Sequence, residues 1–215
     1  GAHPYLIKAE KKGDTIFGDL HYYNDSITEF WMIEDQSYEL ADSKTLTKLK
    51  DGVQSINFNF KDTNGKFVSL NDIQFKDKVV VVQILGTWCP NCLDETQFFL
   101  SYLEEHPNED LAFVGLSVEA AKTEEKAMKR IKNMIDKFNI PYPILLAQYG
   151  GTDKEKFLKK IPMLENLISY PTTIIIDKSG KVNSIHTGFN GPATGQAYVD
   201  YKEDFKIEIR GLLEL

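Results

Sequence analysis

The chain has 215 residues, of which 42% are hydrophobic and 27% are charged, and its mean hydropathy is −0.32, which predicts a globular protein of one ordinary domain and an appendage. Its formal net charge of −7 and pI near 5.2 argue against the clustered basic surface that nucleic acid or an anionic membrane surface would require. Apolar runs fall short of the roughly 18–20 residues of a transmembrane helix.

Residues 1–52 are predicted to form a β-rich N-terminal region and a linker. Three runs of β-branched and aromatic residues are separated by turn-forming residues, which indicates a small antiparallel sheet. The runs are Tyr5–Ala9, Thr15–Tyr23 and Ile27–Ile33. Asp42–Gly52 is interpreted as a polar linker to the next domain.

Beyond the linker, residues 53–215 are predicted to alternate as a hairpin, strand, helix, strand, helix, strand, helix, two strands and a final helix. Val79–Leu85 is an apolar, valine-rich run that predicts a buried strand. Thr123 precedes an apolar stripe at helical spacing and is a predicted N-cap. A second stripe follows in the C-terminal helix. This alternation predicts an α/β domain.

Both cysteines of the chain lie in Trp88-Cys89-Pro90-Asn91-Cys92, after the buried strand and before a helical pattern. A disulfide scaffold would distribute its cysteines, and a zinc site would need further ligands, whereas the four histidines form no pair at zinc-finger spacing. We therefore expect a redox-active dithiol with no metal and no cofactor. A structural disulfide and half of a zinc site are the alternatives.

The spacing of the two cysteines places both on one side of the first helical turn, with Cα atoms roughly 5–6 Å apart, which a disulfide accepts. Cys89 faces unpaired backbone N–H groups at the helix N-terminus, which stabilise a thiolate, and Pro90 suits the first helical position. We expect Cys89 to attack a substrate disulfide and Cys92 to resolve the mixed disulfide.

Gly86–Cys92, together with the strand before it, resembles the thioredoxin-like redoxins of the TlpA/ResA group, in the AhpC/TSA-type redoxin superfamily. Tyr170–Asp177 looks like that group's cis-proline strand, and Ile56–Leu70 looks like its N-terminal hairpin. The resemblance covers residues 53–215. It implies a thioredoxin-like fold, with a central mixed sheet flanked by helices, the N-terminal hairpin and an extra βα insertion.

The same resemblance implies that the peptide bond before Pro171 is cis and that Pro171 lies against Cys89, which leaves the backbone of Tyr170 free to pair with substrate. Trp88, Pro90, Tyr170 and Pro171 are the expected substrate-binding residues. Trp88 has a second interpretation, as an aromatic side chain that only packs the junction.

The chain departs from thioredoxin in two places. Gln83 stands where thioredoxins carry a buried carboxylate, so the thiol of Cys92 needs another base. The resemblance points to Glu119 as this proton acceptor, since a partly desolvated carboxylate can shuttle a proton. A water held by Gln83 and a merely solvated Glu119 are the alternatives. The surplus segment 148–167 is interpreted as a surface helix beside the active site.

The leading hypothesis is a thiol–disulfide oxidoreductase that acts on protein disulfides and receives electrons from an upstream thiol donor. A thiol peroxidase is the second hypothesis, but Gly86 and Val82 stand where peroxiredoxins place Thr or Ser and Pro relative to Cys89. A non-enzymatic accessory protein acting through residues 1–52 is the third.

The resemblance implies an extracytoplasmic, bacterial reductant, periplasmic or lipid-anchored, as in cytochrome c maturation or thiol repair. The lack of further cysteines suits an oxidising compartment. Gly1-Ala2-His3 looks like a remnant of expression, so we expect an export signal or lipid anchor to precede the natural chain.

Overall fold

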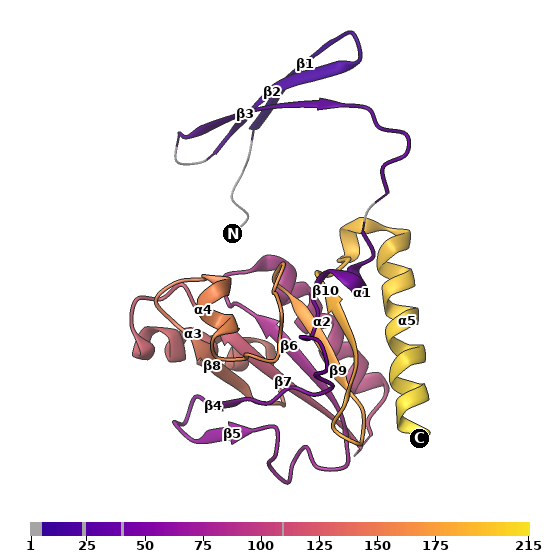
Figure 1. Cartoon of the computed structure of the whole chain (residues 1–215). Helices are drawn as coiled ribbons and strands as arrows, with labels where there is room; N and C mark the ends of the chain where they lie inside the picture. The colour runs from indigo at the N-terminus through magenta and orange to yellow at the C-terminus, as the bar shows by residue number, and fades with distance from the viewer. Residues whose placement is uncertain (1–5, 23–24, 40, 109) are drawn as a thin grey trace. The chain divides into compact units, whose positions relative to one another are not determined.

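The computed structural model describes residues 6–22, 25–39, 41–108 and 110–215. The chain divides into two compact units, Gly1–Ala41 and Asp42–Leu215, which are described separately (Figure 1). This division lies eleven residues before the boundary predicted at residues 52/53. The predictions for Gly1-Ala2-His3 and for the strand ends at Tyr5 and Tyr23 fall outside the described residues.

The smaller unit is a three-stranded antiparallel sheet in the order β1-β2-β3. Its strands are β1 (Leu6–Lys12), β2 (Thr15–His21) and β3 (Ile27–Ile33). Leu6 pairs with His21, and His21 pairs with Ile27, without a break in register along either pair of strands. The predicted small antiparallel sheet is therefore confirmed.

The larger unit contains a seven-stranded mixed sheet in the order β10-β9-β6-β7-β8-β4-β5. Its strands are β4 (Asn59–Lys61), β5 (Phe67–Ser69), β6 (Val79–Leu85), β7 (Leu111–Val118), β8 (Ile144–Gln148), β9 (Thr172–Ile176) and β10 (Val182–Thr187). The pairs β6–β7 and β7–β8 are parallel, and the remaining pairs are antiparallel. Every residue of β6 is buried, as expected for a central strand covered on both faces.

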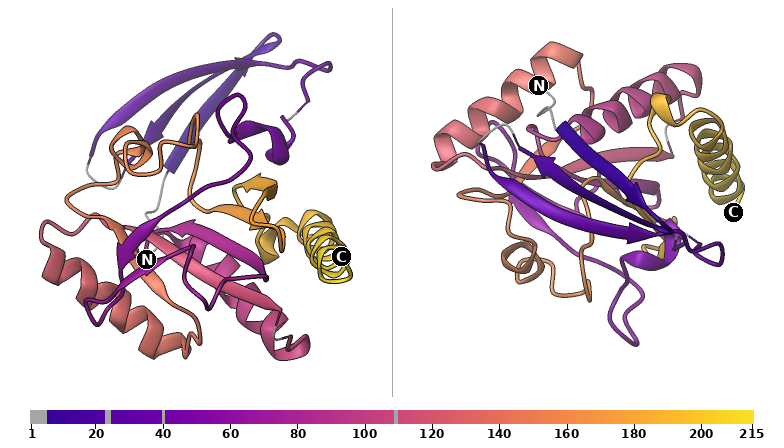
Figure 2. Two further views of the ribbon diagram at one scale, coloured as in Figure 1. Left: turned by 60° about the horizontal axis from the view of Figure 1, so that its bottom comes forward. Right: turned by 90° about the horizontal axis from the view of Figure 1, so that it is seen from above.

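Three long helices bury their apolar sides in one cluster with alternate residues of the sheet: α2 (Pro90–Glu105), α3 (Glu124–Phe138) and α5 (Gln196–Leu213). Figure 2 shows α5, in yellow, at the β9–β10 end of the sheet. Thr123 caps α3 by accepting from Lys126 N, as predicted. The short elements are α1 (Ser43–Leu46), α4 (Lys154–Leu158) and the 3₁₀ turn Pro192–Thr194.

Segment 42–52 was predicted as a polar linker, and this prediction is wrong. Thr47 is buried, and Lys50 N donates to Met163 O at 3.0 Å. Lys48 N donates to Asn166 Oδ1, and the Asn166 amide donates in turn to Leu46 O. The segment therefore packs on the chain that leads to β9, because its backbone finds hydrogen-bonding partners there.

Segment 148–167 was predicted as a surface helix, and only α4 within it is helical. Phe157 and Ile161 are fully buried in the cluster on the second face of the sheet, together with Leu164 and Leu167. The many lysines in this segment suggested an exposed helix, but its apolar side chains pack against the second face of the sheet and bury it.

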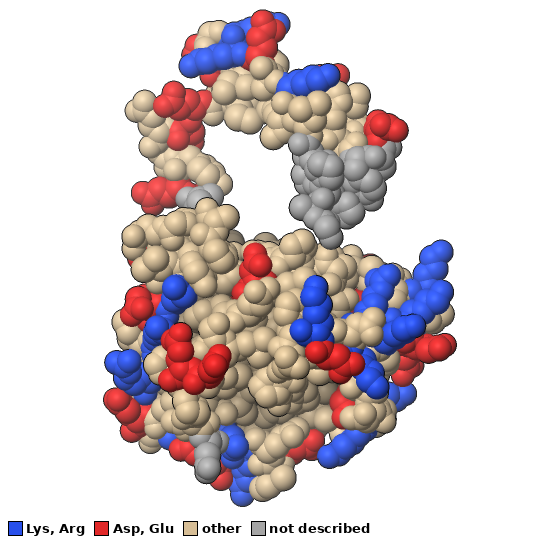
Figure 3. Space-filling view, turned by 180° about the vertical axis from the view of Figure 1, so that it is seen from behind, with Lys and Arg blue, Asp and Glu red and all other residues tan. Residues whose placement is uncertain are grey.

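Charged side chains of both signs are interspersed over the face of the larger unit in Figure 3. Among the described helices, none has both the length and the apolar character needed to span a bilayer.

Candidate active site

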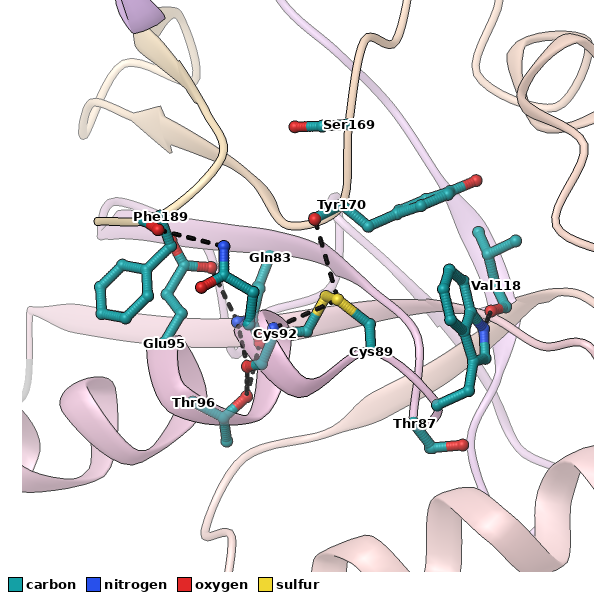
Figure 4. The surroundings of a disulfide bond; sticks show 12 residues. Gln83, Thr87, Cys89, Cys92, Glu95, Thr96, Val118, Ser169, Tyr170 and Phe189 are labelled. Carbon is teal, nitrogen blue, oxygen red and sulfur yellow. Dashed lines mark hydrogen bonds between the residues drawn. A yellow bond between two sulfur atoms is a disulfide. The ribbon is translucent and has the colours of Figure 1, made fainter. Parts of the chain in front are cut away.

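The two cysteines form a disulfide at the start of α2, with their Cα atoms 5.3 Å apart (Figure 4). Cys89 is the N-cap residue, Pro90 is the first helical residue, and Cys92 is completely buried. The N–H of Cys92 donates to Sγ of Cys89 at 3.3 Å. This hydrogen bond and the helix N-terminus both stabilise negative charge on the Cys89 sulfur in the reduced protein.

The turn between β6 and Cys89 holds Trp88 beside the disulfide. Its indole N–H donates to Val118 O at 2.8 Å, and the residue remains 41% exposed. A Cβ atom on Gly86 would overlap the indole, so only glycine allows this close approach. Trp88 thus presents an aromatic surface next to the reactive sulfurs.

The Tyr170–Pro171 peptide bond is cis, which confirms the prediction. Tyr170 O lies 3.7 Å from Sγ of Cys89, and the Tyr170 ring packs edge-to-face on Trp88 with centroids 5.7 Å apart. A sulfur in a disulfide carries no hydrogen, so the contact with Tyr170 O is a packing contact in this state. Trp88 and Tyr170 thus lie in contact next to Cys89, beside Pro90 and the cis bond before Pro171, and the role of these four residues in substrate binding stays a prediction.

Glu95 is a site residue that the sequence analysis missed. It lies one helical turn beyond Cys92 and is 0% exposed. The Gln83 amide donates to Glu95 Oε2 at 2.8 Å and to Cys92 O at 3.2 Å. Its position three residues after Cys92 was the available signal, because residues at that spacing share one side of a helix.

Burial raises the pKa of Glu95 from its ordinary value of 4.5 to about 7, although three hydrogen-bond donors act in the opposite direction. Besides Gln83, the donors are Thr173 Oγ1 at 2.9 Å and Tyr201 Oη at 3.0 Å, both to Oε1. A carboxyl group with this pKa is present in both protonation states near neutral pH and can accept or return a proton.

Gln83 was predicted to hold a relaying water as one alternative. Its amide nitrogen instead contacts Glu95 and Cys92 directly, while the Thr96 hydroxyl donates to its oxygen at 3.0 Å. The donors and acceptors around Gln83 therefore fix the orientation of its amide and join Glu95 to the helix turn that carries Cys92.

Glu119 was the predicted proton acceptor, with a solvated strand-end residue as the alternative. The alternative is wrong, because Glu119 is 0% exposed. Its carboxylate accepts from Thr87 N at 2.9 Å, from Thr87 Oγ1 at 2.8 Å and from Ser117 Oγ at 2.7 Å. Glu119 thus links the turn before Cys89 to the end of β7 by hydrogen bonds. Its role in proton transfer stays a prediction.

Comparison with known proteins gives matches to redoxins. The profile of the AhpC/TSA family matches residues 52–185. The thioredoxin-like protein YneN of Bacillus subtilis is 30% identical over 146 residues, which cover 68% of this chain and 76% of that protein. The thiol-disulfide oxidoreductase ResA of Bacillus subtilis is 26% identical over 140 residues, which cover 65% of this chain and 69% of that protein.

The solved structure of a thiol-disulfide oxidoreductase from Bacteroides fragilis aligns with a TM-score of 0.52 at 15% identity. The alignment covers 71% of this chain and 99% of that structure. At this identity the match shows a shared fold, and the expected thioredoxin-like fold is confirmed.

Proposed function

Because the chain belongs to the AhpC/TSA family of thioredoxin-like redoxins, related to the ResA and TlpA thiol–disulfide oxidoreductases, we propose that it exchanges its Cys89–Cys92 pair with disulfides of other proteins. One observation carries the proposal: the disulfide sits at the N-terminus of α2 and against the cis peptide bond before Pro171. We assign the activity to residues 53–215 and none of it to residues 1–52.

In the first step of the proposed reaction, the Cys89 thiolate attacks one sulfur of a substrate disulfide. A bond forms between the two sulfurs, the substrate disulfide breaks, and the departing substrate sulfur leaves with the electron pair. Cys92 then attacks Cys89 Sγ, which forms the Cys89–Cys92 disulfide and releases the second substrate thiolate. Two electrons have then passed from the protein to its substrate.

Cys92 must lose its proton for the second step, and we propose Glu95 as the acceptor. Three observations support this role: Glu95 is buried, it follows Cys92 by one helical turn, and both contact the Gln83 amide. Its raised pKa of about 7 suits a group that takes up and returns protons near neutral pH. These observations favour Glu95 over Glu119.

Trp88, Pro90, Tyr170 and Pro171 are proposed to contact the substrate polypeptide. They surround Cys89, which is the less buried of the two cysteines. Trp88 offers an exposed aromatic surface to the substrate. The backbone around the cis bond offers hydrogen-bonding groups to an extended segment of the substrate polypeptide.

We further propose that the protein works outside the cytoplasm as a reductant, kept reduced by an upstream thiol donor, as in cytochrome c maturation or thiol repair. The proposal is supported by the resemblance to the TlpA/ResA group and by the absence of cysteines other than the reactive pair.

Trapping tests the proposed function. A Cys92→Ser variant should accumulate a covalent adduct between Cys89 and a disulfide-containing protein, because the resolving thiol is gone. The matched Cys89→Ser variant should trap nothing and should lose activity completely. Adducts would be measured by non-reducing electrophoresis and mass spectrometry. Adducts on Cys89→Ser alone would reverse the two roles, and reductant-driven peroxide consumption without any disulfide exchange would replace the proposal by a peroxidase.

A further inference from the structure

A cavity of about 220 Å³ lies between α5, strands β9 and β10, and the segment at the start of α1. Its lining residues include Thr173, His186, Asp200, Tyr201 and Asp204, but neither cysteine and not Trp88. Asp200 and Asp204 are exposed, so the cavity has a polar rim in contact with solvent.

Two of the residues that line this cavity are also the hydrogen-bond donors to Glu95. Thr173 Oγ1 and Tyr201 Oη both donate to Glu95 Oε1, at 2.9 Å and 3.0 Å. Glu95 itself is not a lining residue. Thr173 and Tyr201 therefore each contact the buried carboxylate through a hydroxyl group and also line the cavity.

We infer that the proton taken from Cys92 leaves the protein through the Tyr201 hydroxyl and this cavity, rather than through the surface around Cys89. This inference rests on the proposed function and adds a relay residue to it. Protonated Glu95 donates to the Tyr201 oxygen while Tyr201 releases its own hydrogen to water in the cavity. One proton is transferred, Tyr201 is neutral before and after, and no oxidant or reductant takes part.

A route through the cavity matters because a docked substrate covers the other route, which is the surface around Cys89. The substrate polypeptide is expected to lie over Trp88 and Tyr170, which excludes water from the sulfurs during the resolving step. The cavity is lined by neither Trp88 nor Tyr170, so we expect it to stay open at that moment. The proton can then reach solvent before the product leaves.

His186 packs edge-to-face on the Tyr201 ring, with centroids 4.8 Å apart. Its Nδ1 lies 3.1 Å from Gly188 O and its Nε2 lies 2.8 Å from Ser43 Oγ. Burial lowers the pKa of His186, so the ring is neutral at pH 7, with the hydrogen on Nδ1 donated to the carbonyl. His186 therefore fixes the Tyr201 ring and adds no positive charge beside it.

Further titratable or charged groups face the cavity or the pair of Glu95 and Tyr201. They are Asp42, Lys44, Asp200, Asp204 and Glu208 around the cavity, and Tyr142 near Glu95. Most are carboxylates, so they favour the arrival of a proton at the cavity. The raised pKa of Glu95, about 7, allows it to deliver a proton there near neutral pH.

A Tyr201→Phe variant of the full chain tests the relay. It keeps the ring, which packs on Phe98 and Phe189, and removes only the hydroxyl. At pH 6, where most Glu95 is protonated and must first release its proton, the resolving step should be slowed about tenfold, as followed by stopped-flow release of a thiol from a preformed mixed disulfide on Cys89. The rate of attack by Cys89 should stay unchanged.

The pH profile separates a relay from a structural role. If Tyr201 only tunes Glu95, the midpoint of the profile shifts and the plateau above it keeps the wild-type rate. A lost relay keeps that plateau, because ionised Glu95 accepts the proton directly, and adds a separate slow phase below the midpoint, where protonated Glu95 must first release its own proton. It also makes the rate rise with added imidazole, a small buffer that fits the cavity, whereas the wild type should not respond.

Tyr198→Phe is the matched control, because Tyr198 lies one turn earlier on α5 and packs on Phe189 and Lys202. It should resolve at the wild-type rate. Ala197→Leu is the second test, since Ala197 lines the cavity and a larger side chain there excludes water while the Tyr201 hydroxyl remains. This variant should slow the resolving step in the same way.

Wild-type resolving rates in both Tyr201→Phe and Ala197→Leu would overturn the inference and leave the proposed function intact. A failure of Cys92→Ser to trap any protein would instead overturn the proposed function. If Tyr201→Phe does not fold, the Ala197→Leu result decides the inference by itself.

Discussion

The regions next to the two cysteines each contain a completely buried glutamate, and the two glutamates are held in different ways. Beside Cys89, Glu119 accepts hydrogen bonds from the backbone and hydroxyl of Thr87 and from Ser117. Beside Cys92, Glu95 accepts from the side chains of Gln83, Thr173 and Tyr201.

From this difference we infer that the partners of a buried carboxylate, and not its burial by itself, decide whether it exchanges protons. Glu119 anchors the turn before the attacking cysteine, so its oxygens serve to hold backbone in place. Glu95 shares the Gln83 amide with the carbonyl of Cys92, and its other two donors, Thr173 and Tyr201, line a cavity. We infer that one glutamate positions Cys89 and the other exchanges protons with Cys92.

The largest expected effect is on the rate of the resolving step, and it distinguishes Glu95 from Glu119 directly. Glu95→Gln should slow the resolving step about a hundredfold at pH 7, because general acid–base groups contribute roughly 10²–10⁴ in rate. Glu119→Gln should change it by less than about threefold, since a glutamine oxygen can still accept from Thr87 N. Stopped-flow kinetics of the mixed disulfide measure both. The reverse order of sensitivity would return the role of proton acceptor to Glu119.

The second effect is the pH dependence of stability. The pKa of Glu95 is raised from 4.5 to about 7 in the folded protein, so the stability associated with its protonated form is complete below pH 4.5 and is lost as the pH rises through about 7. Relative to Glu95→Gln, the wild type should lose about 3 kcal/mol of unfolding free energy over this window. Urea unfolding of both oxidised proteins at pH 4.5 and pH 8 measures the difference, and parallel curves would contradict it.

The smallest effect concerns the anchoring role of Glu119. Glu119→Ala should lower the free energy of unfolding by about 2 kcal/mol, because Thr87 and Ser117 lose a charged acceptor. Glu119→Gln, which keeps one acceptor, should recover part of this loss. Urea unfolding at pH 7 provides the test. Equal stability of Glu119→Ala and the wild type would show that the turn before Cys89 does not need this anchor.

Much of the fold was predictable because the relevant signals are local. The all-apolar run Val79–Leu85 specifies a central strand, and Thr123 with the apolar stripe after it specifies a capped helix. The interpretation of segments 42–52 and 148–167 failed for one reason. The conformation of each segment depends on residues far away in the chain, as Lys50 N depends on Met163 O. The polar composition of both segments gave no sign of these contacts.

The candidate site shows the same division. Cys89 and Cys92 were predicted from their spacing, and the cis bond before Pro171 was predicted from the resemblance to the TlpA/ResA group. Glu95 was missed because a glutamate in a helix is ordinarily exposed. Its burial follows from Tyr201 and Thr173, which come from elements about eighty to a hundred residues away.

The sequence by itself determined the redox pair, the helix turn that carries it and the order of strands and helices, because these depend on residue type and short spacing. Only the tertiary structure decided that Glu95 is buried, that it shares the Gln83 amide with Cys92 O, and that Thr173 and Tyr201, which donate to it, also line a cavity. Those features arise from hydrogen bonds between distant segments, which local propensity does not encode.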